Sequence, residues 1–146
     1  MSLKPYTCAV EPQWIDYNGH MSEAFYVLAF GFATTAVMDA LGLDEDYRQS
    51  ASASLYTVEA HVRYLDEVSP GATLEITTVI AGHGAKKLHL AHEMHVDGSL
   101  VATEEILGLH VDTESGSTSV FPTAINATIT SHEHRIPDWS GRSIST

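Results

Sequence analysis

Three side chains with catalytic chemistry lie within five residues of one another near the start of the chain. Asp16, Asn18 and His20 alternate with Tyr17 and Gly19, directly before a run of regularly spaced apolar residues. A carboxylate can act as a base, an amide can donate a hydrogen bond, and an imidazole exchanges protons near neutral pH. Gly19 lets a carbonyl group approach the backbone closely. This combination is typical of acyl transfer or hydrolysis.

The apolar run that follows predicts one long helix over residues 21–41. Apolar residues recur at every third or fourth position, and Gly42 is a natural stop. The first N–H groups of a helix have no partner within the helix, and the helix dipole is positive there. We therefore expect the backbone N–H groups of Gly19, His20 or Met21 to bind an oxyanion.

A simpler interpretation assigns the same residues to local structure. Asn18 or Ser22 would then cap the helix, Gly19 would complete a turn, and His20 would be an exposed side chain. The motif alone does not separate this interpretation from the catalytic one.

Strand patterns account for most of the remaining chain. A short strand is expected within residues 6–12, and longer ones at residues 55–65, 73–81, 86–96 and 100–111, joined by turns with Gly, Pro, Asp and Ser. Short connections favour an antiparallel meander, and alternating polarity predicts one face exposed to water. Residues 115–146 are expected to form an extended edge element and a loosely held tail.

The order of these elements predicts the α+β class. One domain is expected over residues 1–146, with residues 122–146 as a C-terminal extension, and a curved antiparallel sheet of five or six strands laid against one central helix. Such a sheet covers only part of a long apolar helix, so we expect a symmetric homo-oligomer, a dimer or a tetramer, to bury the remainder.

Composition narrows the partners and the compartment. Lys and Arg number 7 against 19 Asp and Glu, a net charge of −12, which disfavours nucleic acid and anionic membranes. The single cysteine, Cys8, cannot form an internal disulfide, and neither a signal peptide nor a membrane span is recognisable, so a cytoplasmic location is expected. His89 and His92 should face opposite sides of a strand, and we expect no metal site and no cofactor.

The spacing Asp16-x-Asn18-x-His20-Met21 before a helix, followed by Thr57-Val58-Glu59 in the next strand, resembles hotdog-fold thioesterases. The Asp, Asn, His and Glu pattern is similar to that of acyl-ACP thioesterases, which implies Asp16, Asn18, His20 and Glu59 as the catalytic set. The single-domain layout, with Asp16 three residues before Gly19, is similar to the 4-hydroxybenzoyl-CoA thioesterase branch. Where many members continue with Val-Asn-Asn, this chain has Met21-Ser22-Glu23.

Longer segments resemble the thioesterase module that accompanies carnitine dehydrogenases. These segments read WIDYNGHM, YTVEAHVRYLDEV, KKLHLAHEMH and LVATEEILGLHVDT. The resemblance implies betainyl-CoA as the substrate, with CoA as part of the substrate rather than a cofactor. A trimethylammonium group needs aromatic surfaces, for which the candidates are Trp14, Tyr17, Tyr26, Tyr56 and Tyr64. Candidate contacts for the phosphates of CoA are Arg63, Lys86 and Lys87.

Glu59 presents a difficulty within this pattern. Strict alternation places Glu59 on the strand face opposite Val58 and Val62, so it looks outward if these valines face the helix. A bulge, a dimeric sheet or a pocket between subunits would change this geometry.

The sequence thus predicts an acyl-CoA thioesterase in which Asp16 or Glu59 acts as the base. Two other functions stay open at this point. A hotdog hydratase or dehydratase also places acid and base groups beside a helix start. A non-catalytic acyl-CoA binding module would use the same helix end to hold a carbonyl or phosphate group.

Overall fold

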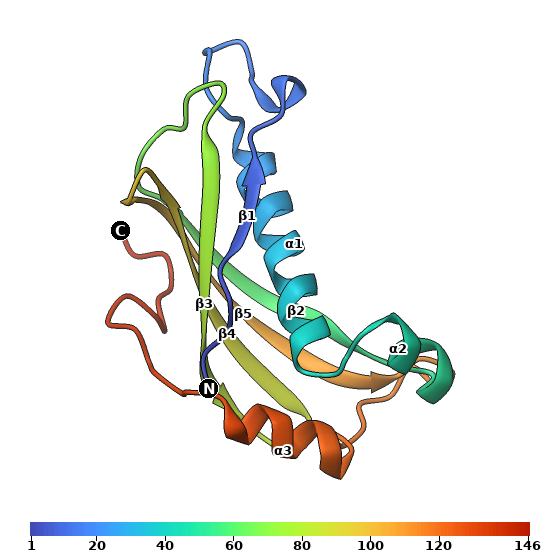
Figure 1. The fold of residues 1–146 in the computed structure, drawn as a ribbon. Coiled ribbons are helices and arrows are strands. Elements are labelled where there is room, and N and C mark those ends of the chain that lie inside the picture. The colour runs from blue at the N-terminus through green and yellow to red at the C-terminus, as the bar shows by residue number, and fades with distance from the viewer.

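The computed structural model describes all residues from 1 to 146 and contains one long helix and one sheet (Figure 1). The strands are β1 (Tyr6–Ala9), β2 (Ala53–Tyr64), β3 (Thr73–His83), β4 (Lys87–Val96) and β5 (Ser99–Asp112). The helices are α1 (Glu23–Ala40), α2 (Glu45–Ala51), α3 (Thr123–Ser131) and the 3₁₀ turn η1 (Pro12–Trp14). Five strands around a single long helix confirm the predicted α+β class.

The strand order in the sheet differs from a simple meander. All neighbours are antiparallel, and the order is β1-β3-β4-β5-β2. The three strands β3, β4 and β5 do pair in sequence, as predicted. However, β2 pairs with β5, and β3 pairs with β1, so the expectation of four strands in consecutive order is wrong at β2. The segment between β2 and β3 crosses the end of the sheet, so β2 is an edge strand whose outer side has no partner strand.

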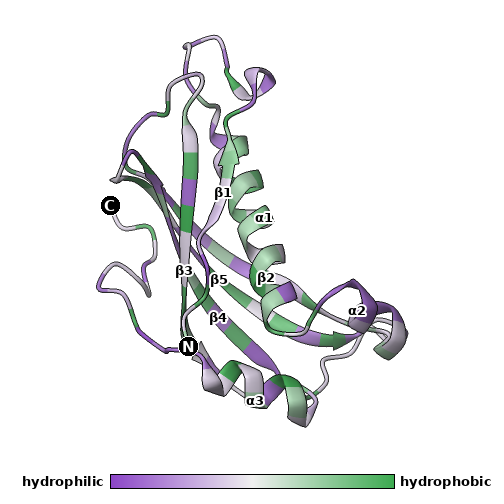
Figure 2. Ribbon diagram, in the orientation of Figure 1, coloured by the Kyte–Doolittle hydropathy of each residue, from purple (hydrophilic) through white to green (hydrophobic).

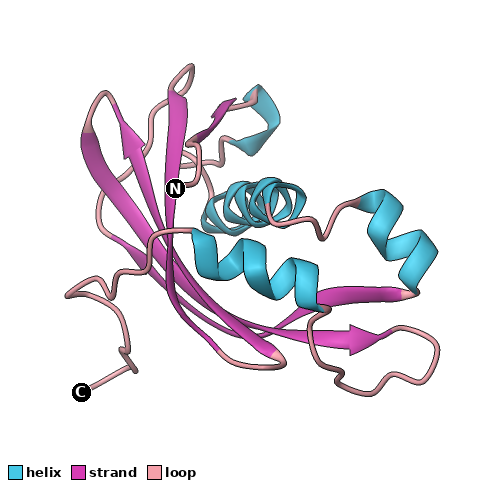
Figure 3. Ribbon diagram, turned by 60° about the horizontal axis from the view of Figure 1, so that its bottom comes forward, coloured by secondary structure: helices cyan, strands magenta, loops and turns pink.

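Helix α1 lies in the concave face of the curved sheet, as the view along the helix shows (Figure 3). Its sheet-facing residues repeat at helical spacing and are buried: Tyr26, Ala29, Phe30, Ala33 and Val37. Hydrophobic colour also covers other faces of α1 (Figure 2), where Val27, Leu28 and Phe32 are 40–45% exposed. No single helix is long and apolar enough to cross a membrane, and α1 with α2 meets that criterion only as a pair bent by 69°.

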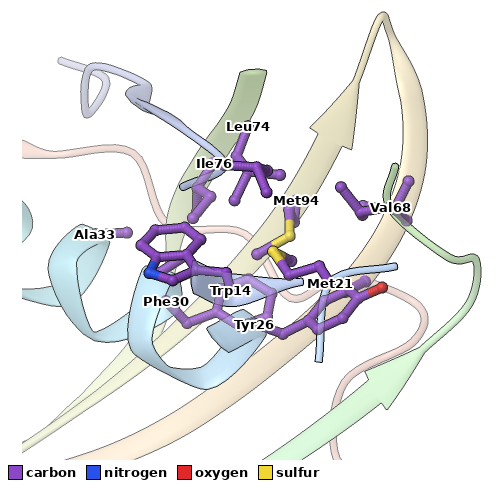
Figure 4. Packing of buried hydrophobic residues seen from close by; sticks show 13 residues of the cluster. Trp14, Met21, Tyr26, Phe30, Ala33, Val68, Leu74, Ile76 and Met94 are labelled. Carbon is purple, nitrogen blue, oxygen red and sulfur yellow. The ribbon is translucent and has the colours of Figure 1, made fainter. Parts of the chain in front are cut away.

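The core has two parts, one at each end of α1. The part near the start of α1 gathers Trp14, Met21, Tyr26, Phe30 and Met94 (Figure 4). The other part packs residues of the second half of α1 against the sheet and α3. Buried residues alternate along β4 as predicted, with Leu88, Leu90 and Met94 facing the helix.

The C-terminal region is more ordered than the sequence predicts. Instead of an extended edge element, it contains α3, whose Ile125 and Ile129 complete the core beside Phe121. The last residues cross the convex face of the sheet, away from α1 (Figure 3). There Trp139 Nε1 donates to Glu93 Oε2 at 2.8 Å, and the N–H of Gly141 donates to Glu105 Oε1 at 2.7 Å. The tail is therefore fixed to the outer face of the sheet.

A histidine is sealed between α1 and the sheet. His92 is 0% exposed, and its ring stacks on Phe30 at 5.8 Å. Thr34 Oγ1 donates to the carbonyl of Phe30, so it accepts from His92 Nε2 at 2.9 Å, while Thr78 Oγ1 donates to Nδ1 at 2.7 Å. Burial lowers the pKa of His92 to about 4, so the ring is neutral at physiological pH.

The buried ring predicts a loss of stability in acid. Because the unfolded state binds a proton on His92 from pH 6.5 downward and the folded state does not, the free energy of unfolding should fall by about 3 kcal/mol between pH 6.5 and 4 through this residue. Urea unfolding followed by tryptophan fluorescence measures it. His92→Gln should be less stable at pH 7.5 and show a flatter pH profile, while His61→Gln, on the half-exposed outer face, should keep the wild-type slope. A wild-type slope in His92→Gln would contradict this account.

Candidate active site

The residues from Asp16 to His20 form a tight hairpin turn in front of α1. The N–H of Asp16 donates to the carbonyl of His20, and the N–H of Gly19 donates to the carbonyl of Asp16, both at 3.0 Å. Asp16 Oδ1 accepts the N–H of Asn18 at 2.8 Å. Gly19 has φ of +78°, which explains why glycine stands there. The turn holds the Asp16 carboxylate in place and leaves its second oxygen unbonded.

His20 is oriented by an acidic residue from another loop. Its Nδ1 atom lies 3.2 Å from Glu67 Oε2, and the His20 side chain is 36% exposed. The same loop is tied to the turn through the N–H of Met21, which donates to the carbonyl of Val68 at 2.9 Å. Nε2 of His20 is left free. When a carboxylate pairs with one nitrogen of a histidine, the other nitrogen is oriented to give or take a proton.

The N–H groups available for an oxyanion differ from those expected. Helix α1 begins at Glu23, and the N–H groups of Gly19 and Met21 already donate to the carbonyls of Asp16 and Val68. The expectation that these two N–H groups bind an oxyanion is therefore wrong in this protomer. The N–H of His20 has no acceptor, and neither have those of Glu23 and Ala24 in the first turn of α1. The sequence pattern placed the helix start two residues too early, so it missed the last two.

A crevice of about 360 Å³ opens at the start of α1. Two tyrosines from different elements, Tyr26 of α1 and Tyr64 of β2, meet edge to face with ring centres 5.1 Å apart. The Tyr64 hydroxyl lies 3.4 Å from the carbonyl of Glu23. The other lining residues are Met21, Glu23, Leu65, Asp66 and Glu67. Three carboxylates and two aromatic rings, with no Lys or Arg, give the crevice a cation-attracting character.

The other three aromatic candidates lie outside this crevice. Trp14 is 6% exposed and stacks on Phe25 with ring centres 5.6 Å apart, so it is a core residue (Figure 4). Tyr17, at the tip of the turn, is 97% exposed. Tyr56 is half-exposed in the middle of β2. Of the five predicted aromatic contacts, only Tyr26 and Tyr64 line the crevice. Tyr26 is itself 4% exposed and its hydroxyl donates to the carbonyl of Asp66 at 3.0 Å, so Tyr64, 46% exposed, presents the accessible aromatic face.

Glu59 follows a bulge in β2. The register passes from Thr57 opposite Gly108 to Glu59 opposite Leu107, which leaves Val58 as an extra residue. Glu59 lines a cavity of about 420 Å³ with His61, His89, Glu105 and the tail, on the convex face. One protomer thus does not bring Glu59 to Asp16, so its catalytic role stays a prediction that requires a second subunit.

The cations proposed for the CoA phosphates also lie apart from the turn. Lys86 and Lys87 are exposed at the start of β4. The turn at Asp16 instead adjoins the loop of Val68, which joins β2 and β3 at the opposite end of the sheet. A strand of this length spans about 30 Å. Arg63 pairs with Thr103 on the convex side of β2 and β5. These three residues do not form one site with Asp16 within a single protomer.

A buried carboxyl group faces α1 one strand away from Tyr64. Glu104 of β5 is 4% exposed, lies opposite Val62 of β2 and His92 of β4, and forms no hydrogen bond or ion pair. Burial raises its pKa to about 7. Sequence reasoning missed Glu104 because the strand at residues 100–111 was defined by the turns that bound it, and the faces of Thr103, Glu104 and Glu105 were not assigned.

Comparison with known proteins places the chain in a family. Residues 10–129 match the model of the thioesterase-like superfamily, and the chain belongs to that superfamily. A betainyl-CoA thioesterase of Pseudomonas aeruginosa is 38% identical over 97% of this chain and 94% of its own length. An L-carnitine dehydrogenase/betainyl-CoA thioesterase of Agrobacterium fabrum is 41% identical, but this chain covers only 30% of that longer protein.

Solved structures agree with this placement. A Staphylococcus aureus protein in complex with CoA has a TM-score of 0.90 and 25% identity, with 100% of this chain and 98% of that chain covered. A proposed thioesterase of Pseudomonas putida has a TM-score of 0.84 and 35% identity, with the same coverage. The hotdog fold and the thioesterase class that the sequence resemblance implied are therefore confirmed, and the protein is a thioester hydrolase.

The raised pKa of Glu104 predicts a pH-dependent stability difference. The folded state holds the Glu104 proton up to about pH 7 and the unfolded state releases it near 4.5, so wild-type stability from this group is complete below pH 4.5 and is lost as the pH rises through 7. The difference in free energy of unfolding between Glu104→Gln and wild type should therefore shift by about 3 kcal/mol in favour of the variant when the pH rises from 4.5 to 7.5. Thermal and urea unfolding measure this, with exposed Glu75→Gln as control. An equal difference at both pH values would contradict it.

Proposed function

We propose that the protein hydrolyses betainyl-CoA to glycine betaine and CoA. The observation that carries the choice of acyl group is the crevice at the start of α1, where Tyr26 and Tyr64 meet three carboxylates without a Lys or Arg. A trimethylammonium group has no N–H to donate, so aromatic faces and negative charge are the groups that can bind it. The name of the full-length Pseudomonas aeruginosa relative supports the same substrate.

The size of the acyl group requires the cation site and the reaction site to be adjacent. In a betainyl group the nitrogen is separated from the thioester carbon by one methylene, about 2.5 Å, as in the N–Cα–C unit of a backbone. Glu23 lines the crevice and also supplies a free N–H at the helix start. One crevice can thus hold the ammonium group and the carbonyl group together.

In the proposed mechanism, water attacks the thioester carbon beside the turn. Asp16, with one oxygen held by Asn18 and one free, takes the proton from water. The N–H groups of Glu23 and Ala24, at the positive end of α1, stabilise the oxyanion. His20, oriented by Glu67, donates a proton to the departing CoA sulfur. The reaction consumes water and requires no cofactor, and it belongs to carnitine breakdown in the cytoplasm.

The proposed assembly is a homodimer that pairs the β2 edges. Edge strand β2 has no second neighbour, and Val58, Tyr56 and Tyr64 are 46–55% exposed along it. Two-fold symmetry makes the two β2 strands antiparallel. The end of the sheet that carries Lys86 and Lys87 in one subunit then lies beside the Asp16 end of its partner. This arrangement supplies the cations for CoA that one protomer lacks, and a tetramer would add a second such dimer.

The test of the function is release of CoA thiol from a panel of acyl-CoA esters, measured with a disulfide reagent. Betainyl-CoA should be hydrolysed with the highest kcat/KM, and Asp16→Asn should lower kcat at least ~10²-fold because it removes the base. Asp39→Asn, an equal change of charge at the exposed far end of α1, should retain wild-type activity. A wild-type rate for Asp16→Asn would remove Asp16 from the mechanism, and tight binding of acyl-CoA without thiol release would contradict the enzyme itself.

A further inference from the structure

Glu104 is a buried carboxyl group that the proposed mechanism does not use. It projects from β5 into the space beneath α1, since its cross-strand neighbours Val62 and His92 pack on that side of the sheet. No hydrogen bond or ion pair satisfies it. Its oxygens are not fully sealed either, because the one fully buried side-chain atom without a partner is His95 Nδ1. A buried, unpartnered carboxyl group at the edge of an open space requires an explanation.

The position of Glu104 connects it to the aromatic crevice. Tyr64 lies opposite Ala102, so Glu104 is the diagonal cross-strand neighbour of Tyr64 on the same face. Such diagonal pairs are about 7 Å apart, within reach of long side chains. Tyr64 also lines the crevice at the start of α1. Glu104 therefore lies on the same face of the sheet as Tyr64, one strand away from it.

No cation of this chain can neutralise Glu104. From the neighbouring elements it is faced by Val62 and Tyr64 of β2, by His92 of β4, and by the part of α1 that contacts His92. His92 is neutral, because burial lowers its pKa to about 4. The seven Lys and Arg residues lie elsewhere: Lys4, Arg48, Arg63, Lys86, Lys87, Arg135 and Arg142. No ion pair within the chain includes Glu104, so a cation that pairs with it would be a bound ligand.

One flank of α1, which carries Val27 and Gly31, is exposed in the single protomer. Gly31 has no side chain, and a Cβ built there would meet no atom within 4 Å. Val27, one turn earlier on the same flank, is 45% exposed. No side chain of the chain therefore covers this flank of the helix, and a ligand can approach it.

We propose that Glu104 is the specificity residue for the acyl group, supplying the negative charge that binds a quaternary ammonium ion beside the ring of Tyr64. This inference rests on the proposed betainyl-CoA thioesterase function and assigns the cation to one carboxyl group among several. A trimethylammonium ion keeps a carboxylate at methyl distance, so an unbonded carboxylate is a better partner than one already engaged by N–H donors. Burial raises the pKa of Glu104 to about 7, and a bound cation would stabilise its charged form.

The test compares two substrates of the same shape. Betainyl-CoA and 3,3-dimethylbutanoyl-CoA differ by N⁺ against carbon at one position, so the ratio of their kcat/KM values measures recognition of charge alone. Wild type should prefer betainyl-CoA at least ~10-fold, and Glu104→Gln should reduce this ratio by ~10-fold or more. Glu75→Gln, which removes one exposed carboxylate from the convex face of β3, should leave the ratio at its wild-type value.

The ratio separates this role from general-base catalysis. If Glu104 were the base, Glu104→Gln would slow both substrates equally and the ratio would stay at its wild-type value, which overturns the inference. A folded variant that keeps full preference for betainyl-CoA overturns it as well. Should Glu104→Gln not fold, Glu104→Met, of similar length and without charge, gives the same comparison. If wild type itself shows no preference between the two esters, the proposal is already contradicted.

Direct binding separates this inference from the proposed function. Glycine betaine, titrated calorimetrically, should bind wild type at least ~10-fold more tightly than Glu104→Gln, whether or not the protein turns over any ester. If wild type releases no thiol from any ester but binds glycine betaine through Glu104, the function fails and the cation site stands. If thiol is released from betainyl-CoA while glycine betaine binds both proteins equally, the function stands and the role of Glu104 is overturned.

Discussion

The packing of one helix across the concave face of a five-stranded sheet determines most features of this protein. A single helix cannot cover a sheet of this width, so the apolar residues of α1 bury its centre, while the flank of the helix that carries Val27 and Gly31 stays exposed. The same packing orients the start of α1, with its unpaired N–H groups, toward the turn at Asp16. The site lies where the helix begins, beside the turn that precedes it.

Adjacent residues of β5 show how strongly this packing divides the chain. Glu104 faces the helix, and burial raises its pKa to about 7. Glu105 points to the convex face, where burial acts in the same direction but is outweighed by the N–H groups of Gly141 and Arg142 and by His89, so its pKa is lowered. Two glutamates of the same strand thus have opposite electrostatic roles. One is satisfied by the chain itself and fixes the tail, and the other has no partner within the chain.

The net charge of the protein favours the quaternary ammonium group of the proposed substrate. With a net charge of −12 the chain attracts a quaternary ammonium ion over its whole surface but repels the phosphates of CoA. The two requirements must be met at separate places. Acidic and aromatic groups gather at the start of α1, while Lys86 and Lys87 lie at the other end of the sheet. Pairing of two β2 edges would place these two ends together across the two subunits.

Local patterns in the sequence were sufficient for the α+β class, the long helix, the alternation along β4 and the turn at Gly19, because each depends on residues within a few positions of one another. They were also sufficient to point to Asp16, Asn18 and His20, which lie within five residues of one another in the chain. The pairing of β2 with β5, the bulge at Val58 and the partnership of His20 with Glu67 were decided by contacts distant in sequence. Nothing near Glu104 distinguishes it from Glu105. Only the sheet register, which turns one toward α1 and the other toward the tail, makes it a buried charge without a partner.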